Sequence, residues 1–347
     1  MPNHRCVWAL IWLCFSSTGM LRSSVAAESQ YKTGPGPLAV KSVLLDWTDA
    51  NRDRTVPVKI YYPDVPEGKF PVILFSHGLG GSREGYAYLG NFWASFGYVC
   101  VHLQHVGSDN SVWQGLAPDE VMPALRKAIA VPANVINRPL DVSFAIDQLE
   151  KINQDDPLFK SRLDLDHIGL AGHSFGAFTT LATAGEVFIT RKGTKLHRPD
   201  VRVKAAIAMS ESAPKDPQQY DSAFEKIAIP MMHMTGTLDD SPIGDGKAAD
   251  RRIPFDHMPA VADQYLVILQ GGDHMVFSGR GLEKSLTGLR DNASDPKFQS
   301  LIQQSTLAFW DAYLKSDETA QKWLRDGACK LMLGTDASLE VKTAKEH

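Results

Sequence analysis

Short runs of continuously apolar residues recur along this chain, separated by stretches compatible with helices. In two of these runs, residues 72–75 and 205–209, apolar side chains occupy successive positions, so both faces of a strand formed there would be buried. Strands of this kind occur in mostly parallel sheets that helices cover on both sides. The runs that we interpret as strands are residues 56–62, 71–76, 98–103, 168–172, 205–210, 231–235 and 265–270.

Helices are expected between these strands, because parallel strands need long crossover connections. Candidates are residues 86–95, residues 139–152 with Pro139 in the first turn, a segment beginning at Ser174, and residues 306–315. The alternation predicts an α/β fold, with a mostly parallel, doubly wound sheet of about eight strands flanked by helices. The 347 residues, 44% of them hydrophobic, suffice for one large core, and we expect a single catalytic domain over residues 38–335.

Two segments do not fit the alternation: residues 107–137, and residues 244–259 with the pair Arg251 and Arg252. Both follow predicted strands, and ligands of open α/β sheets bind beyond the carboxyl ends of strands. They are therefore candidates for the walls of a substrate pocket, with ordinary surface loops as the alternative.

The N-terminal residues 1–27 have the organisation of a secretory signal peptide. His4 and Arg5 precede about nine apolar residues, and small residues ending at Ala27 follow. We expect cleavage after Ala27 and a secreted or periplasmic protein; a membrane anchor is the alternative, although the apolar run is shorter than the roughly 20 residues that cross a bilayer. Residues 28–37 are predicted as a linker and residues 336–347 as a C-terminal tail. For Cys100 and Cys329, the cysteines beyond the signal, we expect two separate thiols, with one disulfide between them as the alternative.

The segment Gly172-His173-Ser174-Phe175-Gly176 fits the GxSxG nucleophile elbow of α/β hydrolases. It follows a predicted strand and precedes a predicted helix, which is the context that the motif requires. In such a turn the glycines avoid collisions with neighbouring backbone, and the serine hydroxyl is lifted into a cleft. Ser174 is therefore the predicted nucleophile.

A serine hydroxyl needs a base and an acid, which in this fold follow it in the order acid, then histidine. His274 lies just past the last predicted strand and is the expected base. Asp239 follows the strand at residues 231–235 and is the expected acid, with Asp240 as the alternative and Glu211 as a third candidate.

The segment 76–81, Ser-His-Gly-Leu-Gly-Gly, follows an early strand and predicts an oxyanion loop. Two backbone N–H groups, of Leu79 and of Phe175 after the nucleophile, would hold the negative charge of the reacting carbonyl. His102 and His105 are spaced as metal ligands can be, but no Cys, Asp or Glu accompanies them at ligand spacing, so no metal site is predicted.

Residues 75–81 and 172–176 together resemble the platelet-activating-factor acetylhydrolase and dienelactone-hydrolase-like branch of α/β-hydrolase serine esterases, over residues 56–274. The resemblance implies hydrolysis of carboxylic esters, often with short or modified acyl groups, without a metal or organic cofactor. It also supports Leu79 and Phe175 as oxyanion donors. The chain departs from the acetylhydrolases where they carry the acid, since residues 209–212 include no aspartate; the acid looks shifted to Asp239, as in dienelactone hydrolases and cutinase-like enzymes. Dienelactone hydrolases proper use a cysteine where this chain has Ser174.

The sequence thus predicts a serine esterase that acts on small-molecule or lipid-like esters, with acetyl or other short acyl groups favoured. Polyester or lipase activity, amidase or acyltransferase activity with the same residues, and a catalytically silent binding protein remain alternatives. The net charge of −4 and the scattered Lys and Arg predict no nucleic-acid partner, and no stable membrane insertion is expected after signal cleavage.

Overall fold

The computed structural model describes residues 30–189, 193–279 and 293–344. The predicted signal peptide, residues 1–27, lies outside these described residues, as do Cys6 and Cys14. A nine-stranded sheet forms the centre of the molecule, in the order β1-β2-β4-β3-β5-β8-β9-β10-β11. The six strands from β4 to β10 in this order are parallel, whereas β1, β2 and β11 pair antiparallel at the two sides. The predicted mostly parallel α/β sheet is confirmed, with nine strands rather than about eight.

The strands of the large sheet are β1 (Val40–Asp49), β2 (Arg54–Pro63), β3 (Phe70–Ser76), β4 (Val99–Leu103), β5 (Leu163–His173), β8 (Val203–Met209), β9 (Met231–Leu238), β10 (Gln264–Asp273) and β11 (Ala337–Lys342). A separate hairpin is formed by β6 (Val187–Ile189) and β7 (Lys195–His197). The α-helices are α2 (Ala87–Ser95), α3 (Pro118–Ala130), α4 (Pro132–Asp155), α5 (Phe175–Ala184), α6 (Tyr220–Phe224), α7 (Ile253–His257), α8 (Asp295–Leu314), α9 (Glu318–Arg325) and α10 (Ala328–Leu333).

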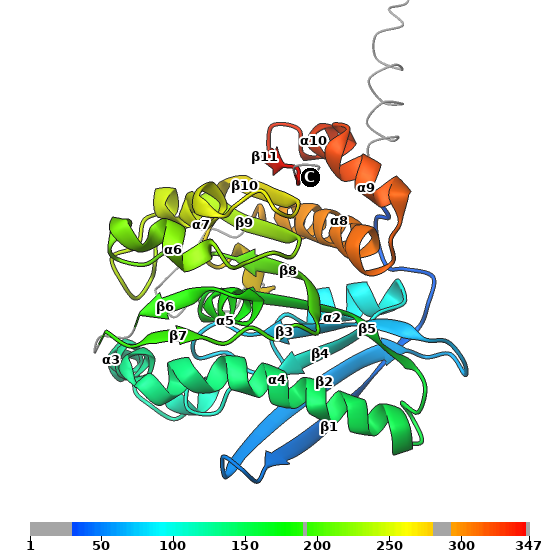
Figure 1. Ribbon diagram of the computed structural model, residues 1–347, viewed down its shortest axis with the longest axis horizontal. Coiled ribbons are helices and arrows are strands. Elements are labelled where there is room, and N and C mark those ends of the chain that lie inside the picture. Colours follow the sequence, from blue (N-terminus) through cyan, green and yellow to red (C-terminus); the bar gives the residue numbers. More distant parts are fainter. Residues whose placement is uncertain (1–29, 190–192, 280–292, 345–347) are drawn as a thin grey trace, which may run out of the picture.

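Apolar side chains on both faces of the sheet are buried against helices, as the doubly apolar runs predict. On one face, α2 and α8 pack in a cluster that includes Trp93 and Trp310. On the other face α4 packs through Val142 and Ile146, and α5 and α6 pack beside it. Figure 1 shows α8, α9 and α10 together with β11 at the upper end of the molecule, and α4 along its lower half. Because β3, β5, β9 and β10 are parallel, their carboxyl ends meet at one edge of the sheet.

Helix α4 begins earlier than the sequence predicts. It starts at Pro132, and Pro139, expected in the first turn, lies inside the helix. Pro132 occupies the first-turn position instead, where a missing N–H costs nothing. The turn around Pro139 is buried through Arg138 and Asp141, so tertiary contacts stabilise a helix that an internal proline would otherwise interrupt.

The two ends of the domain also differ from the prediction. Residues 336–347 were expected to be a tail, but β11 pairs with β10 over residues 337–342. In the segment predicted as a linker, Tyr31 is buried, and its hydroxyl donates to Asp311 on α8 at 2.7 Å. Both segments therefore pack on the domain. Residues 107–137 and 244–259, which do not fit the predicted alternation of strands and helices, contain α3 and α7, respectively.

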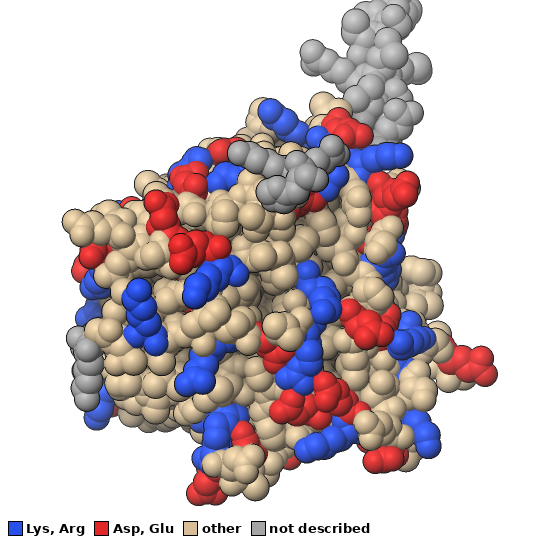
Figure 2. Space-filling model, in the orientation of Figure 1, with Lys and Arg blue, Asp and Glu red and all other residues tan. Residues whose placement is uncertain are grey.

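Positive and negative side chains are interspersed over the visible face of the molecule (Figure 2). No helix of the described residues is both long and apolar enough to cross a membrane. Cys100 and Cys329 are buried and are not bonded to each other, in agreement with the prediction of two separate thiols.

Candidate active site

Ser174 lies in the sharp turn between β5 and α5. Its backbone has φ 57° and ψ −116°, a conformation that residues with a side chain rarely adopt and that marks functional turns. A methyl group on Gly172 would lie 2.3 Å from the carbonyl oxygen of Gly176, and one on Gly176 would lie 1.8 Å from that of Ser76. Only glycine at both positions lets the turn pack against the end of β3. This close packing explains why the motif has glycine at both positions.

His274 follows β10 and reaches the elbow, 100 residues away in the chain. Its Nε2 lies 2.9 Å from the Ser174 hydroxyl oxygen, and its Nδ1 lies 2.7 Å from a carboxylate oxygen of Asp239. The Asp239 side chain is fully buried, whereas Ser174 is partly exposed. The structure therefore joins the three predicted side chains in one series of hydrogen bonds that ends on the hydroxyl of a partly exposed serine.

Two further side chains contact the Asp239 carboxylate. The Thr235 hydroxyl donates to its second carboxylate oxygen at 2.8 Å, and the buried Arg251 guanidinium lies 3.6 Å from the first. Burial by itself would raise the pKa of Asp239, but the hydrogen bond with His274 and the positive charge of Arg251 outweigh burial and lower it. Asp239 is therefore an ionised carboxylate at neutral pH, suited to orient the imidazole and to stabilise its cationic form.

The two alternative acids lie elsewhere. Asp240 is exposed and accepts hydrogen bonds from the Lys247 ammonium and the Ala248 N–H, both at 2.9 Å. Glu211 is buried after β8 and lies 2.6 Å from Nδ1 of His233, not beside His274. The geometry favours Asp239 over both.

The predicted oxyanion loop passes directly behind Ser174. A methyl group on Gly78 would lie 3.4 Å from Cβ of Ser174, so the loop and the elbow are in contact. Among the described residues, neither the Leu79 N–H nor the Phe175 N–H has a hydrogen-bond acceptor. The Phe175 N–H is also one of the first in α5, where no intrahelical acceptor exists. The segments that contact or follow Ser174 therefore each carry an unpaired backbone donor among the described residues.

His173, the residue before Ser174, connects the predicted oxyanion loop to the loop of His274. Burial, reinforced by the nearby His274, lowers the pKa of His173 well below its usual value, so its ring is neutral. Its Nε2 lies 2.9 Å from the His274 carbonyl oxygen, an acceptor, so Nε2 carries the proton and Nδ1 accepts from the Tyr86 hydroxyl at 2.8 Å. Tyr86 in turn accepts from the Gly78 N–H at 3.3 Å.

Sequence reasoning missed several buried polar residues around the site. It assigned no role to Tyr86 or Arg138, and it placed Arg251 on a possible pocket wall. Arg251 is instead buried and donates to the carbonyl oxygens of Ser210, Glu211 and Asp239, which fixes the ends of β8 and β9 next to each other. These residues occur in irregular segments or on helices, with no local pattern that marks them.

The two histidines considered as metal ligands have other contacts. His102 Nδ1 lies 3.0 Å from the Gly85 carbonyl oxygen, and His105 lies between Ser76 and Asp141. Within the described residues, no group of three or more His, Cys, Asp or Glu side chains could hold a metal ion. Nothing in the site geometry requires a cofactor.

Trp93 is in the core, where its indole N–H donates to the Thr306 hydroxyl at 3.1 Å. Trp113 is partly exposed and donates to the Gly80 carbonyl oxygen at 2.8 Å. Trp113 therefore lies beside the oxyanion loop, and Trp93 does not.

The sheet order, the elbow after β5 and the histidine after β10 define an α/β hydrolase. A family model described as platelet-activating factor acetylhydrolase, isoform II, matches residues 28–121. This range includes β1 to β4 and the oxyanion loop but ends before Ser174.

Curated relatives agree with the family match. Platelet-activating factor acetylhydrolase of Cavia porcellus is 24% identical over 82% of this chain and 65% of its own length. The acetylhydrolases of Bos taurus and Canis lupus familiaris are 27% and 28% identical over 34% of this chain. The chain thus spans about two thirds of the first relative and one third (32%) of the other two. It is an α/β hydrolase that is similar, over these ranges, to platelet-activating factor acetylhydrolases.

Proposed function

We propose that this protein is a serine esterase that cleaves acetyl or other short-chain carboxylic esters through an acyl-enzyme on Ser174. The observation that carries the proposal is the hydrogen-bonded order Asp239, His274, Ser174 beside two unpaired backbone N–H groups. Each part is required because a neutral serine is a weak nucleophile and the tetrahedral intermediate carries a negative charge.

In the first half-reaction, His274 Nε2 takes the Ser174 proton while the hydroxyl oxygen bonds to the ester carbonyl carbon. The carbonyl electron pair moves onto its oxygen, where the N–H groups of Leu79 and Phe175 stabilise it. The oxyanion then re-forms the carbonyl, the bond to the alcohol oxygen breaks, and the imidazolium gives its proton to the departing alcohol.

In the second half-reaction, His274 deprotonates a water molecule that attacks the acyl-enzyme. The same two N–H groups stabilise the second oxyanion, and the released Ser174 oxygen recovers the proton from the imidazolium. Asp239 remains ionised throughout and keeps the imidazole in the tautomer that presents an unprotonated Nε2 to Ser174. No metal or organic cofactor takes part in either step.

The preference for short acyl groups is supported by the names of the relatives, which are acetylhydrolases, and by the resemblance of the two loops. Lipid-like esters, polyesters and amides are the competing substrates for the same site chemistry. A protein that binds esters without turnover is the competing function.

The proposal is tested by hydrolysis of p-nitrophenyl esters of increasing acyl length, with a matched amide and with Ser174→Ala as the control. We expect an optimum at acetyl or butyryl, little amide cleavage, and a loss of more than roughly 10⁴-fold in Ser174→Ala at unchanged thermal stability. An optimum at long acyl chains would favour a lipase, faster amide turnover an amidase, and no turnover at any length would contradict the esterase function.

We also propose that residues 1–27 direct export and are removed after Ala27. The support is the charged, apolar and small-residue order of that segment, which lies outside the described residues. The mass of the protein recovered from the periplasm or medium of a bacterial host tests this. A mature chain beginning at Glu28 is expected, and a full-length chain in the cytoplasm would contradict export.

A further inference from the structure

Arg138 is a fully buried arginine on α4, directly behind the oxyanion loop. Among the described residues, no carboxylate lies within ion-pair distance of its guanidinium. A buried charge without a direct partner is costly to the folded state, so its presence calls for a reason other than stability.

The guanidinium contacts both segments that carry the proposed oxyanion donors. Its Nη1 donates to the His77 carbonyl oxygen at 2.8 Å, two residues before Leu79. Its Nε donates to the Ser108 hydroxyl at 3.0 Å, and the Ser108 carbonyl oxygen accepts the Gly80 N–H at 2.9 Å. The residues on both sides of Leu79 are therefore fixed, directly or through Ser108, by the same side chain.

The segment that carries the second proposed donor, Phe175, also contacts the Arg138 guanidinium. The guanidinium carbon lies 4.2 Å from the centre of the Phe175 ring, within the range of a cation–π contact. Nη1 also lies 3.4 Å from the Thr179 hydroxyl, one turn further along α5. Arg138 thus spans the gap between the oxyanion loop and the helix that follows the nucleophile.

The carboxylate of Asp141 is connected to Arg138 through two neutral side chains, those of His105 and Ser76. Burial, reinforced by the positive charge of Arg138, lowers the pKa of His105 to about 4, so this ring is neutral. His105 Nδ1 donates to Asp141 at 3.0 Å, its Nε2 accepts from the Ser76 hydroxyl at 2.9 Å, and Ser76 accepts from Arg138 at 3.3 Å. This second Ser–His–Asp series is fully buried. It orients the guanidinium of Arg138 but places no carboxylate in direct contact with it.

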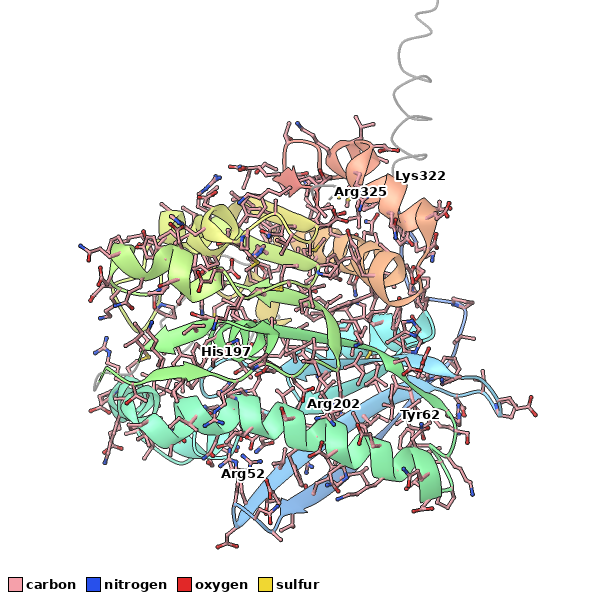
Figure 3. The ribbon with its side chains drawn as sticks, in the orientation of Figure 1. Arg52, Tyr62, His197, Arg202, Lys322 and Arg325 are labelled. Atoms are coloured by element: carbon pink, nitrogen blue, oxygen red, sulfur yellow. The ribbon has the colours of Figure 1, made fainter. Side chains whose placement is uncertain are left out.

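Asp141 at the far end is ionised and fixed. Burial would raise its pKa, but hydrogen bonds from His105 and Arg54 outweigh burial and lower it to about 2. Arg52, from the turn between β1 and β2, reaches α4 (Figure 3) and donates to the same carboxylate at 2.8 Å. Two arginines therefore already bond to Asp141, and Arg138 shares the negative charge of this carboxylate with them. Burial lowers the pKa of Arg138 to about 9, and the side chain is still charged at neutral pH.

We propose that Arg138 is a positioning residue of the oxyanion hole: it fixes the Leu79 and Phe175 segments relative to each other and supplies a buried positive charge that favours the oxyanion. This inference rests on the proposed esterase function. Because the charge acts on an anion that exists only in the tetrahedral state, Arg138 is expected to affect kcat more than KM.

The test compares Arg138→Met, which removes the charge and keeps an apolar stem, with Arg138→Lys, which keeps a charge but not the planar fork. The control is Arg162→Met. Arg162 also donates to backbone carbonyl oxygens and lies over an aromatic ring, Phe70, but at the amino end of β5. For each protein we would measure kcat and KM for p-nitrophenyl acetate, the active fraction by fluorophosphonate titration, and the inhibition constant of an alkylboronic acid, which forms a tetrahedral adduct on serine.

In Arg138→Met we expect kcat per active site to fall by roughly 10- to 100-fold with KM changed by less than about threefold, and the boronic acid to bind more weakly by the same factor. Arg138→Lys should be intermediate, and Arg162→Met should match the unchanged protein in kcat and inhibition. If Arg138→Met does not fold, the kcat and the boronic-acid inhibition constant of Arg138→Lys test the inference.

Folded Arg138 variants with unchanged kcat, or with a lower kcat but unchanged boronic-acid affinity, would overturn the inference and leave the esterase function standing. An unmodified protein that neither hydrolyses the ester nor reacts with the fluorophosphonate would instead overturn the proposed function, and this inference with it.

Discussion

The ring Nε2 of His173 donates to the carbonyl oxygen of His274 at 2.9 Å, so the residue before the proposed nucleophile holds the loop that carries the proposed base. On its other side, His173 accepts from the Tyr86 hydroxyl, which also receives the Gly78 N–H of the oxyanion loop. One neutral imidazole thus couples the positions of three loops that are far apart in the chain. Geometry at Ser174 therefore depends on groups that do not contact a substrate.

Tyr86→Phe is expected to reduce kcat about tenfold, because Nδ1 of His173 loses its donor and a buried acceptor is left unpaired. The matched control is Tyr98→Phe, which removes a buried hydroxyl bonded to Asp311 at 2.7 Å, away from the site. Both variants should lose about 1–2 kcal/mol in the free energy of unfolding. Steady-state kinetics and urea unfolding check this; an equal loss of kcat in both variants would show that the effect is general destabilisation.

Asp239→Asn and Asp240→Asn should separate the two candidate acids. Asp239 is buried against His274, whereas Asp240 is exposed beside Lys247. We expect Asp239→Asn to lower kcat by about 10³- to 10⁴-fold, because the amide favours the wrong imidazole tautomer. Asp240→Asn should stay within about twofold of the unchanged protein, since exposed ion pairs contribute little. A reversed order of the two variants would assign the acid to Asp240.

Gly176→Ala should prevent the elbow from packing, because its methyl group would lie 1.8 Å from the Ser76 carbonyl oxygen in rigid backbone. We expect a loss of about 3 kcal/mol or more in the free energy of unfolding, or no soluble protein. The control, Gly85→Ala, places its methyl group in ordinary contact with the Ser82 carbonyl oxygen, at 3.4 Å, and should cost less than about 1 kcal/mol. Thermal unfolding of both variants decides the matter, and a stable Gly176→Ala would contradict the tight turn.

Glu186 predicts a pH dependence of stability. Burial, reinforced by the charge of Glu211, raises the pKa of Glu186 to about 8, against roughly 4.3 in the unfolded chain. Between these values the folded protein keeps a proton that the unfolded chain has lost. The free energy of unfolding should therefore fall as pH rises from about 4.3 to 8, by up to about 1.4 kcal/mol per pH unit from this group.

Glu186→Gln removes this titration while keeping the shape of the neutral acid. The variant should match the unchanged protein near pH 5 and be more stable at pH 8, by an amount on the order of 4 kcal/mol. Urea unfolding across this range is the measurement. Parallel profiles for the two proteins would mean that Glu186 is not a buried neutral acid.

The sequence was most informative where the constraint is local. The elbow at Ser174 is recognisable because its two glycines meet backbone atoms within one turn and at the end of β3. Strands such as β3 and β8 are recognisable because helices cover both of their faces. Asp239 and His274 could be placed because each follows a strand whose carboxyl end reaches the same edge of the sheet.

The missed features depend on contacts between distant segments. Strand β1 is exposed on one face and pairs only with β2, so its sequence lacks a continuous apolar run. Helix α4 runs through Pro139 because the packing of its buried face outweighs the local penalty. Arg138 reaches its acceptor in the oxyanion loop across 61 residues of chain, and nothing around position 138 marks a buried cation.

The most direct test of the central claim, that Ser174 is the nucleophile, is peptide mapping by mass spectrometry after reaction with an alkyl fluorophosphonate. A single adduct on Ser174, absent from Ser174→Ala and formed more slowly in Asp239→Asn, is the predicted result. Ser76 is an internal comparison, because its hydroxyl also lies 2.9 Å from a histidine that is bonded to an aspartate, but in a fully buried position. An adduct on Ser76 or on any other residue, or ester turnover without an adduct on Ser174, would contradict the account.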